Sequence, residues 1–194
     1  PLREAEARVV AHAVLERVDF AAPDLLDQLG RHTAEQLRYR ALPVEPGPLA
    51  DALVVALRAP LGGPMGQRAL VDLSRQDRLD ELSFDLPLAR LDARAIAQVV
   101  VGHLPAEDRL RPWFEQAAAG EHRVDIAGLL TGSIDLVART AAGGVWLADY
   151  KSNLLPDGDY GPDALADAMA HHGYPLQATL YLVALHRYLR WRMR

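Results

Sequence analysis

The segment that decides the fold runs from Gly132 to Asn153 and reads GSIDLVARTAAGGVWLADYKSN. Two apolar runs flank the small, glycine-rich residues 141–144, a pattern typical of a β-hairpin. Asp135 lies seven residues before Ala142, and Asp149 lies seven residues after it. A hairpin that turns about this point places the two aspartates opposite each other, with Cβ atoms about 5 Å apart. A bulge would shift this register by one residue.

Facing aspartates carry a physical cost, because like charges directly opposite each other destabilise a sheet. A divalent cation removes the repulsion, and oxygen ligands suit Mg²⁺ or Mn²⁺. Side chains alternate along a strand, so Asp149 and Lys151 point to the same side. The hairpin therefore predicts a metal site on Asp135 and Asp149. The alternative is a solvated face on which Asp149 and Lys151 form an ordinary surface pair.

Lys151 is the only lysine among the 21 lysines and arginines of the chain. An ammonium group is compact and approaches a water molecule or a phosphate oxygen as a point charge, which a planar guanidinium does not. The residue type at this position therefore favours a chemical role for Lys151.

These residues resemble the core of the PD-(D/E)XK nucleases, and more closely the C-terminal nuclease domain of RecB type. A bare D…DxK pattern is weak evidence, but here Ser152 and Asn153 follow it, and Gln-x-x-x-Tyr comes about 25 residues later. The resemblance is densest over residues 128–190 and continues more thinly back to about His12. The matching stretches are Gly132–Val137, Asp149–Asn153, Tyr174–Tyr181 and Ala184–Leu189.

The resemblance implies roles for residues outside the hairpin. His12 matches a metal-binding histidine, although Arg8-Val9 replaces the Gly-Thr that precedes it in such nucleases. Glu81 matches a glutamate of the acidic site, and the alternative is a solvent-facing strand residue. Gln177 and Tyr181 lie four apart on one helical face, where they either support the site and DNA or simply pack. The implied site holds Asp135, Asp149 and Lys151 as catalytic residues, His12, Glu81 and the Tyr150 backbone carbonyl as further metal ligands, and Gln177, Tyr181, Ser152 and Asn153 as supporting, DNA-binding residues.

Length and composition limit the class of protein. The chain has 194 residues, half of them hydrophobic, which suits one globular domain. We expect a mainly helical lobe over residues 1–75 and a nuclease core over 76–194, in a piece of a longer polypeptide. No apolar run is long enough for a transmembrane helix. The absence of cysteine excludes an Fe–S cluster and fits a cytoplasmic protein.

The expected fold is α/β: a mixed sheet of four or five strands, restriction-endonuclease-like, flanked by helices and preceded by the helical lobe. Residues 123–130 are expected either as a separate strand or as a β-arm leading into the hairpin. Period-2 alternation predicts a strand over residues 78–88. Apolar spacing, proline and glycine predict helices over residues 3–18, 23–38, 49–58, 92–101, 106–119, 162–172 and 174–192.

The expected function follows from the resemblance: Mg²⁺-dependent hydrolysis of DNA phosphodiesters, of exodeoxyribonuclease V type, with Mn²⁺ able to substitute. Such nucleases work beside a helicase motor that supplies single strands, with RecC-like and RecD-like subunits, in double-strand break repair and recombination. The net charge of −5 suggests that the domain does not capture DNA alone, because phosphate affinity comes mainly from Lys and Arg. The alternative is a catalytically inactive nuclease fold that serves for docking or DNA handling.

Overall fold

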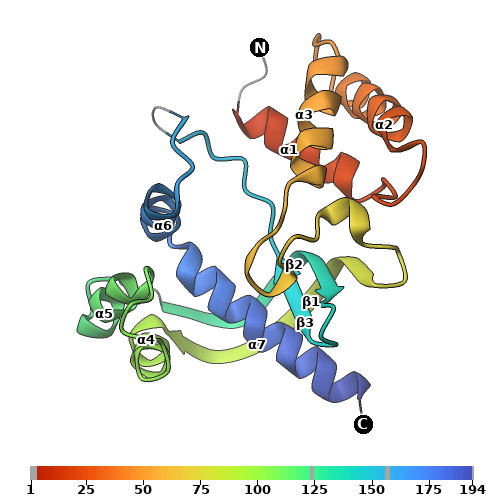
Figure 1. Cartoon of the computed structure of the whole chain (residues 1–194). Helices are drawn as coiled ribbons and strands as arrows, with labels where there is room; N and C mark the ends of the chain where they lie inside the picture. Colours follow the sequence, from red (N-terminus) through yellow and green to blue (C-terminus); the bar gives the residue numbers. More distant parts are fainter. Residues whose placement is uncertain (1–3, 123–124, 156–157, 194) are drawn as a thin grey trace. The chain divides into compact units, whose positions relative to one another are not determined.

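The computed structural model describes residues 4–122, 125–155 and 158–193, with side chains omitted at 4, 89–91 and 125–126. Figure 1 shows the elements along the chain. The helices are α1 (Glu4–Leu15), α2 (Leu25–Tyr39), α3 (Gly47–Arg58), α4 (Ala93–Val101), α5 (Arg111–Ala119), α6 (Pro162–His171) and α7 (Tyr174–Arg192). The strands are β1 (Arg78–Asp92), β2 (Asp125–Arg139) and β3 (Val145–Ala148), and two short 3₁₀ turns span Gly63–Met65 and Leu70–Asp72.

One sheet with the order β1-β2-β3 forms the framework, and β2 and β3 run antiparallel. The expected helix-flanked α/β fold is confirmed. The described residues hold three sheet strands rather than the expected four or five. The reason is that residues 125–130 form a β-arm continuous with the hairpin, so two expected strands are one strand of 15 residues. The expected start at Arg123 lies outside the described residues.

The hairpin between β2 and β3 has the predicted register. Its ladder pairs Arg139 with Val145 and ends at Leu136 with Ala148, so the next position along it places Asp135 opposite Asp149. The turn is closed by the Thr140 N–H, which donates to the Gly144 carbonyl at 2.9 Å. Gly143 has a φ of 81°, a left-handed conformation that glycine adopts without strain. The glycine-rich residues 141–144 therefore form the hairpin turn that the sequence predicted.

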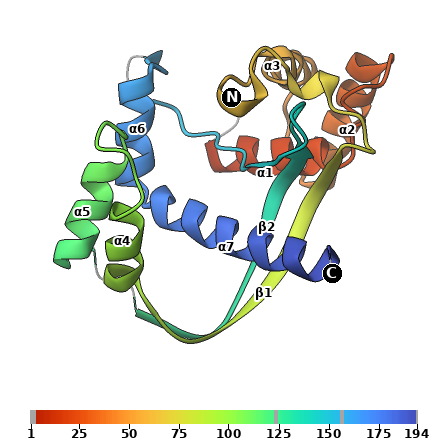
Figure 2. The ribbon, with the colours of Figure 1, turned by 60° about the horizontal axis from the view of Figure 1, so that its bottom comes forward.

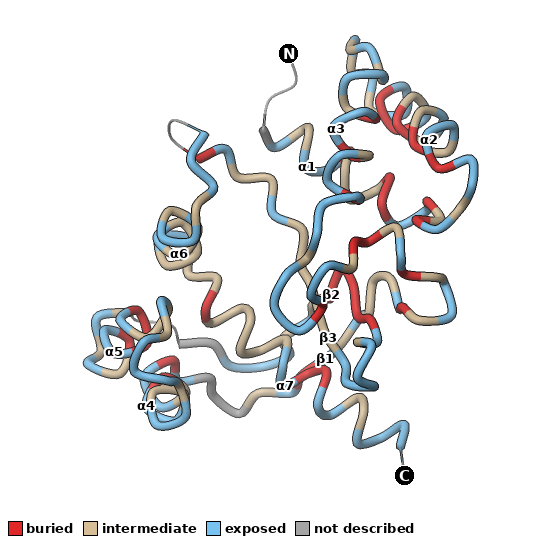
Figure 3. The backbone as a smooth tube through the Cα atoms, in the orientation of Figure 1, coloured by how far each residue is buried: buried red, intermediate tan, exposed pale blue. Residues whose placement is uncertain are grey.

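The chain divides into two compact units, and strands β1 and β2 each contribute to both. The first unit comprises residues 1–83 and 133–153, so the helices α1–α3 and the hairpin share it. Its core joins Val10 and Val14 of α1, and Val18 three residues after the helix, all fully buried, to Leu136 and other apolar residues. Figure 3 shows the buried positions along α2 and β2. This core fixes α1 against the hairpin.

The second unit comprises residues 84–132 and 154–194. Helices α4 and α5 lie side by side in it, as Figures 1 and 2 show, around the buried rings of Trp113 and Phe114. The Asp92 carboxylate caps α4 by accepting from the Arg94 N–H at 2.9 Å. Gly120 ends α5 in a left-handed conformation, as predicted. Among the described residues, no helix combines the length and apolar character needed to cross a membrane.

Candidate metal centre

Three metal-ligating side chains meet in the first unit, each from a different element. His12 comes from α1, Glu81 from β1 and Asp135 from β2, and one ligand-capable atom of each lies within 4.8 Å of the others. Asp135 is 8% exposed, so it is one of the few buried charged residues described. The sequence predicted all three as site residues, and the fold brings them together.

His12 is held in one tautomer by the hairpin. Its Nε2 lies 3.1 Å from the Tyr150 carbonyl oxygen, and since a carbonyl only accepts, Nε2 must carry the hydrogen. The Tyr150 ring also packs edge-on against the imidazole, with centroids 5.8 Å apart. In the neutral imidazole, Nδ1 then offers its lone pair, and it faces Asp135 Oδ2 at 3.6 Å. Two electron-rich atoms that face each other in this way favour a cation between them.

Asp135 is oriented by the same residue. The Tyr150 N–H donates to Asp135 Oδ2 at 2.6 Å, so one backbone unit holds both His12 and Asp135. Burial raises the pKa of the Asp135 carboxyl, and the nearby charges of Asp149 and Glu81 raise it further. The Tyr150 hydrogen bond lowers this pKa, and so does the positive charge of His12 when its imidazole is protonated. Ionised Asp135 is thus held at a cost that a bound cation would offset.

Glu81 sits on an unusual piece of backbone. Its φ is 55°, in the left-handed region that non-glycine residues rarely adopt, within a long strand. Ser133 donates its hydroxyl to Glu81 Oε2 at 2.7 Å. The sequence analysis found Glu81 but missed Ser133, which precedes Asp135 by two residues and so shares its face of the strand. The Ser-x-Asp spacing was the available signal.

Asp149 and Lys151 form an ion pair with each other. Their side chains are 17% and 29% exposed, so the pair is more enclosed than an ordinary surface pair. The Asp149 charge still reaches Asp135, since it is one cause of the raised pKa of that carboxyl. The structure therefore brings Asp135 together with His12 and Glu81, and places the Asp149–Lys151 pair next to this group.

A further carboxylate near the site is Glu16. Burial raises its pKa, and the charge of Glu81 raises it further. Its N–H donates to the His12 carbonyl at 3.0 Å, which continues the helical pattern by one residue past α1. Positions four apart share a helical face, so Glu16 lies on the same side as His12.

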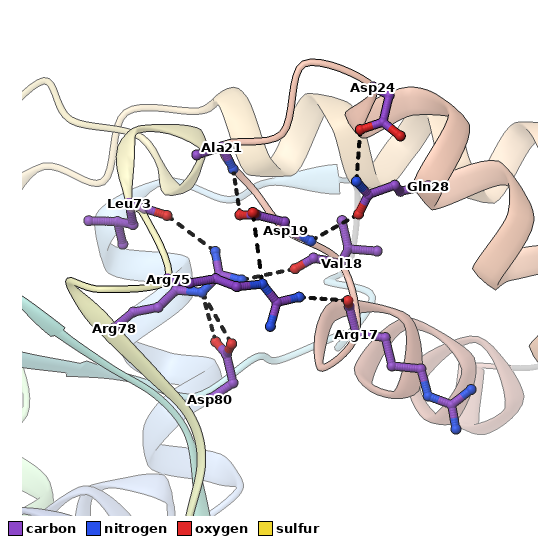
Figure 4. A network of polar contacts seen from close by, with 10 residues as sticks. All are labelled: Arg17, Val18, Asp19, Ala21, Asp24, Gln28, Leu73, Arg75, Arg78 and Asp80. Carbon is purple, nitrogen blue, oxygen red and sulfur yellow. Dashed lines mark hydrogen bonds and ion pairs between the residues drawn. The ribbon is translucent and has the colours of Figure 1, made fainter.

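A buried arginine supports the strand that carries Glu81. The Arg78 guanidinium is fully buried and donates to the carbonyl oxygens of Leu73 at 3.2 Å and Val18 at 2.9 Å (Figure 4). Its Nε binds the Asp80 carboxylate at 3.1 Å, and its planar group lies 3.6 Å from the centre of the Phe20 ring. A buried charge is tolerated only when it is paired and hydrogen-bonded, as it is here. The network fixes the start of β1 beside the end of α1.

The predicted pair on α7 belongs to the second unit. Gln177 donates its Nε2 hydrogen to the Tyr181 hydroxyl at 2.8 Å, as their spacing suggested. The Tyr181 ring packs edge-on against Phe84 at 5.7 Å. Phe84 in turn covers Gly132, where an added Cβ would lie 2.5 Å from the ring. Tyr181 therefore packs, and support of the site and of DNA by this pair stays a prediction. Ser152 and Asn153 are partly buried in the segment after the hairpin.

Proteins named as subunit RecB of the RecBCD enzyme align with nearly the whole chain. RecB of Mycobacterium tuberculosis (strain H37Rv) is 39% identical over 201 residues, 95% of the chain and 18% of that protein. RecB of Mycolicibacterium smegmatis is 38% identical over 200 residues, which are 95% of the chain and 18% of that protein. RecB of Escherichia coli K12 is 32% identical over 197 residues, which are 98% of the chain and 15% of that protein. The chain is a RecB-type domain. No protein-family model matches it.

The RecB-type domain thus spans less than one-fifth of the length of these relatives. The resemblance drawn from the hairpin and from the Gln-x-x-x-Tyr pattern is confirmed at the level of the family.

The donor set of the RecB-type domain fits a divalent cation. It offers one imidazole nitrogen and two carboxylates within 4.8 Å of one another. A ligating histidine usually donates its other N–H to a carbonyl or carboxylate, as His12 does to Tyr150. Carboxylate and carbonyl oxygens suit Mg²⁺ and Mn²⁺, and imidazole suits transition metals. The residues present therefore fit Mn²⁺ as well as Mg²⁺.

Proposed function

We propose that this RecB-type domain is a metal-dependent nuclease that hydrolyses DNA phosphodiester bonds. The observation that carries the proposal is the meeting of His12, Glu81 and Asp135, contributed by three different elements, in a protein related to RecB. A buried carboxylate beside a second one and an imidazole lone pair is costly without a cation. A fold that serves only for docking would be more stable without this cluster of charged groups, so the cluster favours a metal-binding role.

His12 Nδ1, Glu81 and Asp135 would hold the ion, with Asp149 as a further ligand that the family resemblance implies. The resemblance also implies the Tyr150 carbonyl as a ligand, but here that oxygen accepts from His12 Nε2–H and so orients the imidazole instead. When bound, a divalent ion polarises a phosphoryl oxygen and generates a nucleophile from water near neutral pH. The Tyr150 backbone orients two of the ligands through its N–H and its carbonyl. Mg²⁺ is the expected ion, and Mn²⁺ would substitute for it.

Lys151 would stabilise negative charge that develops on the phosphate, or position the attacking water. Its ammonium is held by Asp149, which limits where the charge can move. A preorganised charge stabilises a transition state because little reorganisation is needed when the reaction occurs. Asp149 would thereby act in two ways, as a neighbour of the cation and as the residue that orients Lys151.

The RecB relationship also supports a place in a larger assembly. The relatives are named as subunits of RecBCD, so we propose that this domain works with RecC-like and RecD-like partners and a motor, in DNA repair and recombination. The net charge of −5 is consistent with DNA that is delivered rather than captured. Gln177, Tyr181, Ser152 and Asn153 would support the bound single strand.

Mn²⁺ binding and cleavage of labelled single-stranded DNA in Mg²⁺ test the proposal together. We expect one Mn²⁺ to bind the chain and Asp135→Asn to weaken that binding strongly. Asp51→Asn, an exposed acid of α3 in the same unit, is the matched control and should bind like wild type. Cleavage is measured with the chain and, if the isolated chain is inactive, with the intact RecBCD-type assembly.

Three outcomes separate the alternatives. Mn²⁺ binding and cleavage that are both lost in Asp135→Asn and kept in Asp51→Asn support the nuclease. Metal binding without cleavage in the intact assembly would favour a fold retained for docking or DNA handling. If wild type does not bind Mn²⁺, the metal centre itself is refuted.

A further inference from the structure

Two features constrain Glu81, and neither is required by an ordinary strand. Its backbone is left-handed at a φ of 55°, and its Oε2 accepts the Ser133 hydroxyl at 2.7 Å. A non-glycine residue in this conformation persists only where its surroundings hold it there, and such residues cluster at functional sites. A free glutamate has several rotamers, so a carboxylate fixed at both ends is unusual on the surface of a sheet.

We propose that Ser133 is a positioning residue that fixes the Glu81 carboxylate for cation binding, an inference that rests on the proposed metal centre. A carboxylate only accepts, so the Ser133 hydroxyl must be the donor and its hydrogen points at Oε2. The carboxylate keeps its other oxygen and its remaining lone pairs for an ion. Ligating carboxylates are commonly hydrogen-bonded in this way, and loss of such a partner typically costs about 10–100-fold in metal affinity.

The position of Ser133 on β2 explains how it reaches Glu81 and not another acid. Ser133 and Asp135 are two apart, so their side chains leave the same face of the strand. β1 is the neighbour of β2 in the sheet, and Glu81 comes from it. Asp135 thus contributes a ligand and Ser133 orients the adjacent one. The left-handed backbone at Glu81 fixes the direction of its Cα–Cβ bond, and the Ser133 hydroxyl fixes the position of its carboxylate.

Mn²⁺ affinity, measured by the electron paramagnetic resonance of free Mn²⁺, distinguishes positioning from simple stabilisation. We expect Ser133→Ala to weaken Mn²⁺ binding about 10–100-fold and Ser133→Thr, which keeps a hydroxyl, to restore most of it. Ser74→Ala is the matched control, since Ser74 donates to Asp77 at 2.8 Å in the same unit and neither residue belongs to the ligand group. It should lower the melting temperature in EDTA by a similar amount and leave Mn²⁺ affinity unchanged.

A double-mutant cycle tests whether Ser133 acts through Glu81. In a Glu81→Ala background, Ser133→Ala should have no further effect on Mn²⁺ affinity. Full additivity of the two substitutions, or wild-type affinity in Ser133→Ala, would overturn the inference while leaving the metal centre standing. Failure of wild type to bind Mn²⁺ would instead overturn the proposed function, so the two failures are distinct. If Ser133→Thr does not fold, the cycle alone decides.

Discussion

The left-handed backbone at Glu81 predicts an inverted response to glycine. In an ordinary strand, glycine is less stable than alanine by about 0.5–1 kcal/mol because its unfolded chain has more freedom to lose. At a left-handed position alanine carries a steric cost of roughly 1–2 kcal/mol that glycine avoids. Both Glu81→Gly and Glu81→Ala remove the carboxylate and its Ser133 hydrogen bond, so their difference isolates the backbone. We expect Glu81→Gly to be the more stable by about 0.5–1 kcal/mol.

The assay is urea unfolding in EDTA, followed by tryptophan fluorescence. Ser83 provides the matched control, because it lies two residues along β1, is exposed, and is not among the residues with positive φ. At Ser83 the usual order should hold, with Ser83→Ala more stable than Ser83→Gly. The two positions should therefore give opposite signs. An alanine variant more stable than the glycine variant at both positions would refute the claim that Glu81 is strained.

Three further substitutions test other parts of the structure. Asp135→Asn keeps an acceptor for the Tyr150 N–H. Because the pKa of Asp135 is raised in the folded protein, the protonated carboxyl stabilises the fold at low pH, and this stability is lost as pH rises through the folded pKa. The variant should therefore melt above wild type at pH 7 in EDTA and at the same temperature as wild type in acid. Lys151→Arg should fold and bind Mn²⁺ normally but cleave single-stranded DNA at least about tenfold more slowly, since a guanidinium misplaces the charge; equal rates would remove the role assigned to Lys151. Gly132→Ala should cost about 1–3 kcal/mol in urea unfolding because its Cβ meets the Phe84 ring, and a Phe84→Leu background that fails to reduce this cost would contradict that contact.

Local signals in the sequence were sufficient for much of the fold. The hairpin register followed from the small residues at its turn, and α7 begins and ends at the residues expected, Tyr174 and Arg192. The number of strands was wrong because residues 125–130 continue into the hairpin as the single strand β2, one of the two arrangements that the sequence left open. Gly128 lies inside this strand at a φ of 108°. A glycine in a strand pattern marks either a break or a bend, and the sequence does not distinguish them.

The proposed ligand group was predicted from two sources. Opposed strand positions singled out Asp135 and Asp149, and the family resemblance added His12 and Glu81, which the structure brings together with Asp135. Asp149 pairs with Lys151 two residues away, a local contact that alternation allowed and that charge made favourable. The left-handed conformation of Glu81 has no sequence signature, because only glycine and asparagine commonly mark it. His12 was found through resemblance rather than spacing.

The ligand group draws one residue from each of three segments that are far apart in the chain. During synthesis, α1 and β1 leave the ribosome well before the segment that contains Asp135, so a nascent chain holds at most two of the three ligands. Non-local contacts of this kind also form late in folding, because closing long loops costs entropy before any contact is gained. If the metal centre acts as proposed, cleavage competence would arise only when the first unit is complete, and an unfinished chain would pose no hazard to the DNA around it.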